Sequence, residues 1–115
     1  MELLKGKEFN KKMATYPLTG WKNKGRTSDR DAPGGSWKAY WKTQSDQDWP
    51  TYCCVEGCTE EATDGAHMYC PSVDRREWII PTCHKHNMQY GAEFNLDYIP
   101  AFVSANVSKG KKNGG

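Results

Sequence analysis

Two short clusters of cysteine and histidine constrain the fold of this chain more than any other feature. The first contains Cys53, Cys54 and Cys58, and the second, which follows about two dozen residues later, contains Cys83 and His86. Two ligands from each cluster match the donors and the spacing of a tetrahedral zinc site. The close spacing within a cluster lets one turn direct two side chains to one point, and the longer segment lets the chain return. The sequence therefore predicts one zinc ion held by four side chains.

The second cluster provides two ligands on one face of a helix. Cys83 and His86 are three residues apart, a separation that brings their side chains to the same side of a helical turn. His84 is also present, but it is adjacent to Cys83 and would point about 100° away around the helix. We therefore expect Cys83 and His86 to be the ligands, with His84 as the weaker candidate.

The first cluster provides Cys58, which follows the glycine of a turn, and one further cysteine. Cys53 and Cys54 are alternatives for this fourth ligand. We prefer Cys53, with the alternative left open. Cys70 precedes a proline in a loop, belongs to neither pair, and is expected to be a free thiol. Three thiolates and one imidazole fill the coordination sphere of zinc, which predicts a structural ion with no open position.

The composition indicates a small core that needs a metal. Leu, Ile, Val and Phe together make up about an eighth of the 115 residues, below the ~20% usual for globular chains. The five tryptophans and six tyrosines compensate, because each aromatic ring buries a large area. The net charge of only +2 also differs from the high net charge of disordered chains. An aromatic core stabilised by zinc is the consistent prediction.

Targeting signals are not apparent in the sequence. The basic N-terminus has no apolar run like that of a signal peptide, and no segment has the length of a membrane span. We expect an intracellular, cytoplasmic protein with no membrane partner, most simply a monomer. In that compartment thiols stay reduced, so clustered Cys and His residues indicate zinc rather than disulfides.

The chain divides into three parts by composition. Residues 1–35 are predicted to be a basic and largely irregular arm, 36–103 the zinc-binding domain, and 104–115 a disordered basic tail. Within the domain, Ser36 is a good cap for a short helix with an aromatic face that we expect to lie in the core. Thr82 is the predicted cap of the helix that carries the second ligand pair. The expected elements form a small α+β fold: a helix at 37–42, strands at 52–55, 62–68 and 77–81, a helix from 82, and a short helix at 96–103.

His67 and Asn87 are the candidates for any catalysis. His67 lies between the two ligand clusters after Gly65 and Ala66, and Asn87 directly follows the last ligand. A neutral histidine as general base, with an asparagine oxygen on a divalent ion, is compatible with phosphodiester hydrolysis. The alternative, which a lone histidine favours, is that His67 has only a structural role in the core.

The order of these motifs resembles the HNH endonuclease family and its treble-clef, ββα-metal relatives. The resemblance covers residues 52–91 and implies a treble-clef fold. It assigns His67 as the base and Asn87 as a residue that helps bind a catalytic Mg²⁺ or Mn²⁺. The chain departs from the pattern at Ala66, where the family usually has an acidic residue, and it has no asparagine near Glu77 and Trp78. The implied zinc ligands are Cys53 (or Cys54), Cys58, Cys83 and His86.

The charge distribution favours a nucleic-acid partner, DNA or RNA. Residues 1–30 contain eight lysines and arginines against three acids, and Lys109, Lys111 and Lys112 follow near the C-terminus. We therefore expect a nucleic-acid-binding zinc module that is a divergent or inactive relative of the nucleases. An active metal-dependent endonuclease is one alternative. A protein-interaction module is another, because residues 46–64 contain six acids and no base.

Overall fold

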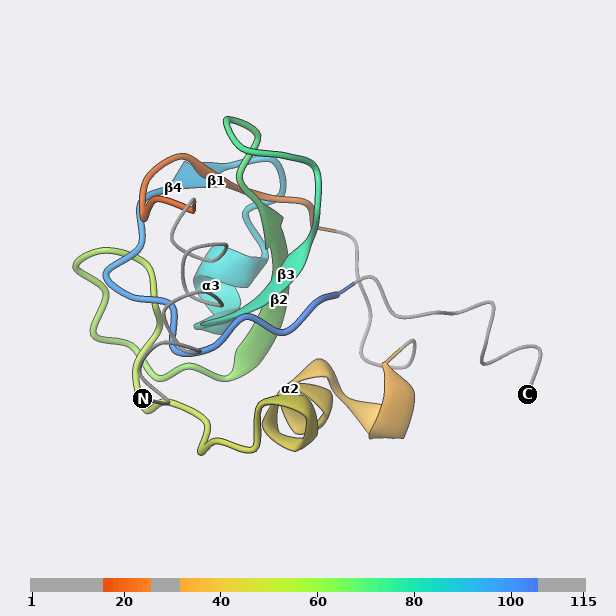
Figure 1. Cartoon of the computed structure of the whole chain (residues 1–115). Helices are drawn as coiled ribbons and strands as arrows, with labels where there is room; N and C mark the ends of the chain where they lie inside the picture. The colour runs from red at the N-terminus through yellow and green to blue at the C-terminus, as the bar shows by residue number, and fades with distance from the viewer. Residues whose placement is uncertain (1–15, 26–31, 106–115) are drawn as a thin grey trace, which may run out of the picture.

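A four-stranded antiparallel sheet with two α-helices forms the described part of the molecule (Figure 1). The computed structural model describes residues 16–25 and 32–105. The strand order is β3-β2-β1-β4, and the predicted small α+β class is confirmed. In this part of the chain no helix is long and apolar enough to cross a bilayer. The elements are β1 (Trp21–Asn23), the 3₁₀ turn η2 (Pro33–Gly35), α2 (Trp37–Ser45), β2 (Asp64–Tyr69), β3 (Trp78–Thr82), α3 (His84–Asn87) and β4 (Glu93–Phe94).

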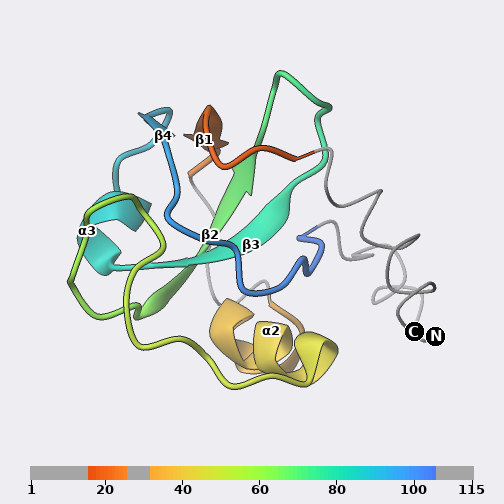
Figure 2. The same cartoon turned by 60° about the vertical axis from the view of Figure 1, so that its left-hand side comes forward.

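The β2–β3 hairpin organises the fold. Its register sets Ala66 opposite Ile80 and His67 opposite Ile79. Because side chains alternate along a strand, Ala66 and Ile80 face one side of the sheet while His67 and Ile79 face the other. Each side is covered by a separate apolar cluster. Figure 2 shows α2 along one side of the hairpin, with α3 near the end of β3.

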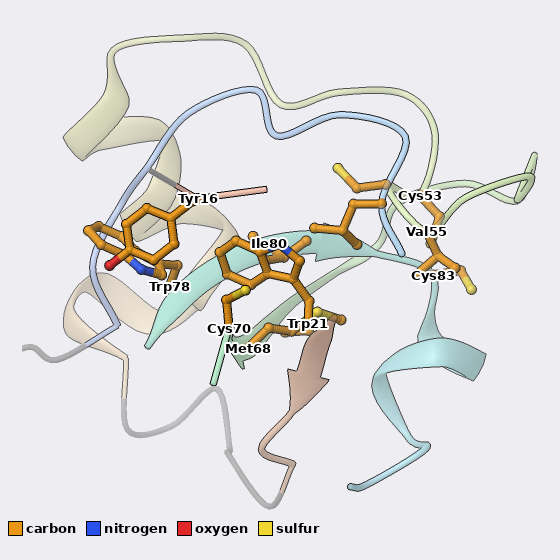
Figure 3. Close-up of a cluster of buried hydrophobic side chains, with 12 residues drawn as sticks. Tyr16, Trp21, Cys53, Val55, Met68, Cys70, Trp78, Ile80 and Cys83 are labelled. Atoms are coloured by element: carbon orange, nitrogen blue, oxygen red, sulfur yellow. The ribbon is translucent and has the colours of Figure 1, made fainter. Parts of the chain in front are cut away.

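The first cluster joins the aromatic core to the cysteines of the predicted zinc site. Trp21, Met68 and Ile80 lie at its centre and are fully buried. In Figure 3, Tyr16 and Trp78 lie at one end of this cluster, and Cys53 and Cys83 lie at the other. The cysteines, together with Val55, therefore form one end of the core.

The second cluster lies under α2, and its core role was predicted. The Ser36 hydroxyl accepts a hydrogen bond of 3.0 Å from the Ala39 amide, as expected of an N-cap. Trp37 and Trp41 are buried and pack with Ile79. The helix runs three residues past the predicted range, to Ser45.

The domain boundaries predicted at residues 36 and 103 need correction. Tyr16 and Trp21 are buried in the core, and β1 pairs with both β2 and β4. A three-residue strand is too short to show a hydrophobic period, so the sequence predicts only an irregular arm for residues 16–25. At the other end, Ser104 pairs with Trp78 and Ala105 is buried. The rest of the predicted arm and tail lies outside the described residues, apart from residues 32–35.

The predicted helix at 96–103 is wrong. These residues form no helix, because their backbone groups bond to distant segments. The Leu96 amide donates to the Leu18 carbonyl at 2.7 Å, and the Val103 carbonyl accepts from the Ile79 amide at 2.9 Å. The predicted strand at 52–55 is reduced to two isolated bridges, at Tyr52 and Val55. These long-range pairs override the local sequence preference.

Asn23 connects the central strand to the helix that carries the second ligand pair. Its Nδ2 donates to three backbone carbonyls at the end of α3, those of Asn87 at 2.9 Å, Gln89 at 3.1 Å and His86 at 3.2 Å. Its Oδ1 accepts from the Gly25 amide at 3.1 Å, and the side chain is 1% exposed. Asn23 thus supplies a further donor at the end of a short helix, where few intrahelical donors remain for the last carbonyls.

Asn23→Asp is expected to destabilise the domain by about 2–4 kcal/mol, because it puts a carboxylate oxygen against three carbonyl oxygens. The change is nearly isosteric, so lost packing contributes little. Urea unfolding of the zinc-loaded protein measures the effect, with Gln44→Glu at an exposed position of α2 as the control for replacing an amide with a carboxylate. Equal stability of the two variants would show that Asn23 does not anchor α3.

Candidate metal centre

The first ligand pair lies on a tight loop between two anchored backbone segments. The Cys58 amide donates to the Val55 carbonyl at 2.9 Å, and Gly57 has a φ of 77°, a conformation that glycine adopts at no steric cost. The Gly57 amide donates to the Asp97 carboxylate at 3.0 Å. The Cys53 amide donates to the Glu60 carbonyl at 2.9 Å. These bonds fix a loop that presents Cys53 and Cys58 to the same point.

The second ligand pair lies at the start of α3. Cys83 is the N-cap, and its Sγ accepts from the His86 amide at 3.4 Å. The predicted cap was Thr82, which instead ends β3 and is fully buried. The shift by one residue leaves Cys83 and His86 on the same turn.

Four potential ligand atoms converge between these two segments. The side chains of Cys53, Cys58, Cys83 and His86 each offer one donor, and these four atoms all lie within 4.8 Å of one another. The His86 Nδ1 is 3.3 Å from the Cys83 Sγ and 3.5 Å from the Cys53 Sγ. Bond lengths of ~2.3 Å to sulfur and ~2.0 Å to nitrogen separate the ligands of a tetrahedral zinc by roughly 3.5–3.8 Å. The cluster can therefore hold a metal ion, and its donors fit zinc.

The protonation of these groups suits a cation. Burial raises the pKa of the Cys53 thiol to about 12, so a thiolate forms there only beside a strong positive charge. Burial, helped by the charge of Lys85, lowers the pKa of His86 below its ordinary value. His86 is then neutral at pH 7, which is the form that binds metals.

The remaining cysteines lie outside the cluster. Cys54, the alternative to Cys53, is fully buried, and burial raises its pKa to about 12. Its backbone is held from both sides, because its amide donates to Pro81 and its carbonyl accepts from Asp97. Cys70 is a free thiol, as predicted, but it is fully buried and its Sγ lies 3.6 Å from the Thr19 carbonyl. Cys70 is therefore part of the core as well.

A polar contact between β2 and α3 supports the ligand helix. The Asp64 Oδ2 accepts from the His84 Nδ1 at 2.8 Å and from the Asn87 Nδ2 at 2.9 Å. Burial alone would raise the pKa of Asp64, but hydrogen bonds from His84, Thr63 and Asn87 outweigh it and leave that pKa below its ordinary value. The stabilisation by this carboxylate is therefore present at neutral pH and is lost as the pH falls through the lowered pKa. The sequence alone does not predict this role of Asp64, because only the packing of β2 against α3 brings these residues together.

The two catalytic candidates do not share a site. His67 is 4% exposed and lies edge-on to Trp37, with ring centroids 4.3 Å apart, on the α2 side of the sheet. Asn87 contacts Asp64, which lies three residues before His67 and so faces the opposite side of β2. The side chains that the resemblance assigns to base and metal binding are therefore separated by the sheet.

No family model matches the chain, and no curated protein or solved structure gives a significant match.

Proposed function

We propose that this chain is a zinc-stabilised, treble-clef-like domain that binds nucleic acid. The observation that carries the zinc assignment is the convergence of three thiols and one imidazole within 4.8 Å. When bound, the ion supplies the positive charge that keeps the thiols deprotonated, and it cross-links the loop to α3. The treble-clef part of the proposal is supported by the order of the elements. A loop with the first ligand pair comes first, the β2–β3 hairpin follows, and the second ligand pair lies at the start of α3.

The charge pattern supports the nucleic-acid half of the proposal. The basic residues gather towards both ends of the chain, and the six acids of residues 46–64 lie between them. Lysines that neutralise phosphates release counterions, which gives an affinity that depends on salt more than on sequence. Phosphodiester cleavage is not part of the proposal, because His67 and Asn87 lie on opposite sides of β2.

Removing Lys109, Lys111 and Lys112 by truncation after Ser108 is expected to weaken nucleic-acid binding. If all three lysines meet phosphates, the slope of log affinity against log salt becomes flatter by roughly 2–3 units. Fluorescence anisotropy with a labelled oligonucleotide between about 50 and 200 mM salt measures this slope. Undetectable binding by the full chain at about 50 mM salt would contradict nucleic-acid binding and favour the protein-interaction alternative.

A further inference from the structure

A basic groove lies on the sheet beyond the part that α2 covers. Its volume is about 360 Å³, and its lining residues include Lys22 from β1, Lys24 directly after β1, Tyr69 from β2, and Arg75 and Glu77 from the loop before β3. This groove is separate from the metal centre, which lies among the cysteines on the other side of the sheet.

The strand register explains why these side chains meet. Lys22 is directly opposite Tyr69, and opposite residues of antiparallel strands project to the same face. Lys24 follows the end of β1, and its amide donates to the His67 carbonyl at 2.8 Å, which holds it beside β2. Tyr69 is two residues after His67, so it continues the side of the sheet that α2 covers further down. The helix covers His67 through Trp37, but it contributes no lining residue at Tyr69.

The charges of the groove are only partly compensated. Glu77 forms an ion pair of 3.1 Å with Lys24. Among residues 16–25 and 32–105, neither Lys22 nor Arg75 forms an ion pair. The Arg75 guanidinium lies 5.7 Å from the centroid of the Tyr69 ring. Two cations and a half-buried aromatic ring therefore line one concave site, a combination that suits a phosphate attached to a planar group.

We propose that this groove binds a single strand of nucleic acid. Lys22 and Arg75 contact consecutive phosphates, and a base stacks against Tyr69 beside the Arg75 guanidinium. A single strand is favoured over a duplex because an aromatic side chain can stack only on a base that is not already stacked in a helix. This inference rests on the proposed function, and it assigns the site where that function takes place.

The groove is connected to the metal centre through one residue. Asn23 is the last residue of β1 and lies between Lys22 and Lys24, and its side chain binds the carbonyls at the end of α3. The segment that presents both lysines is thus fixed to the helix that follows Cys83 and contains His86. The geometry of the groove therefore depends on the position of α3.

The test measures binding of a fluorescein-labelled oligothymidylate to the zinc-loaded full chain by anisotropy over a range of salt concentrations. Lys22→Ala combined with Arg75→Ala is expected to flatten the salt dependence by roughly 1.4 units, at about 0.7 per lost contact with a single strand. The matched control is Lys38→Ala combined with Lys42→Ala, which removes two charges from α2 outside the groove. Its slope is expected to equal that of the wild type.

Tyr69→Leu is expected to weaken binding roughly 5- to 150-fold with little change in slope, because base stacking does not involve counterions. Tyr52→Leu, at an exposed tyrosine outside the groove, is the control and should bind like the wild type. An oligouridylate and a duplex of the same length serve as competitors. The oligouridylate should compete and the duplex should compete poorly.

The outcomes separate the groove from the proposed function. Wild-type binding that neither the double variant nor Tyr69→Leu alters would overturn the groove and leave nucleic-acid binding in place elsewhere on the chain. A duplex that competes as well as the single strand would overturn base stacking in the groove. A wild-type chain that binds no oligonucleotide would overturn the proposed function together with the groove.

Discussion

Cys83→Ser is expected to unfold the domain under conditions in which the wild-type chain is folded. Zinc bound by thiolates and imidazole supplies roughly 10–16 kcal/mol of apparent binding free energy at pH 7. Domains of this size have a net stability of about 5–15 kcal/mol. Cys83 is both a ligand and the cap of α3. It is 5% exposed and belongs to the first cluster, the one that contains Trp21 and Met68. Its loss therefore removes the ion and one end of the core together.

The same result is expected when a chelator removes the metal from the wild type. The dispersion of the amide NMR spectrum reports it, and zinc content measured on the same sample links it to the metal. The control is Cys70→Ala, since Cys70 is buried but lies outside the ligand cluster. We expect Cys70→Ala to lower stability by only about 1–2 kcal/mol while zinc content stays at one per chain. A metal-free wild-type chain with a dispersed spectrum would contradict the structural role of zinc.

Acid should release the ion as well, and the direction follows from the thiols. Burial raises the pKa of Cys53 to about 12 when no cation is present, so protons compete strongly with the metal for this sulfur. Zinc affinity therefore falls as the pH falls.

Trp21→Ala is the substitution outside the metal centre with the largest expected effect. Trp21 is fully buried and sits on the central strand β1. Its ring lies 5.7 Å from that of Tyr16, and its Nε1 donates to the Pro17 carbonyl at 2.7 Å. Replacing a buried tryptophan with alanine typically costs about 3–5 kcal/mol. The chain has few aliphatic residues, so we expect the neighbouring side chains to leave a cavity where the Trp21 ring was.

Urea unfolding of the zinc-loaded protein measures this loss, with Tyr52→Ala as the control because Tyr52 is 56% exposed. The result also distinguishes two descriptions of the N-terminal segment. If residues 16–25 were an irregular arm outside the domain, Trp21→Ala and Tyr52→Ala would have similarly small effects. Because Trp21 is part of the core, we instead expect Trp21→Ala to remove much of the free energy of unfolding, while Tyr52→Ala has only a small effect.

Local spacing in the sequence was sufficient for the parts of the fold that depend on nearby residues. The three-residue separation of Cys83 and His86 and the cap at Ser36 both act within one helical turn, so the sequence contains the information directly. The preference for Cys53 over Cys54 was not decided locally. It depends on Pro81 and Asp97, which hold the backbone of Cys54 from two distant segments.

The features that sequence analysis missed are those built from pairs far apart in the chain. β1 and β4 are three and two residues long, and they exist because each pairs with a strand from elsewhere. The role of Asp64 depends on contact with α3, and the groove depends on Lys22 standing opposite Tyr69. The separation of His67 from Asn87 likewise follows from strand alternation combined with the side on which α3 packs.

X-ray absorption at the zinc edge of the purified wild-type chain tests the saturated zinc site most directly. We expect one zinc per chain, with three sulfur neighbours at about 2.3 Å and one nitrogen neighbour at about 2.0 Å. Cys53→Ser should lose the zinc, as Cys83→Ser does, whereas Cys54→Ser should keep one zinc per chain with all three sulfur neighbours. A wild-type shell with two sulfurs or with a bound water oxygen would contradict the saturated site, as would loss of zinc from Cys54→Ser in place of Cys53→Ser.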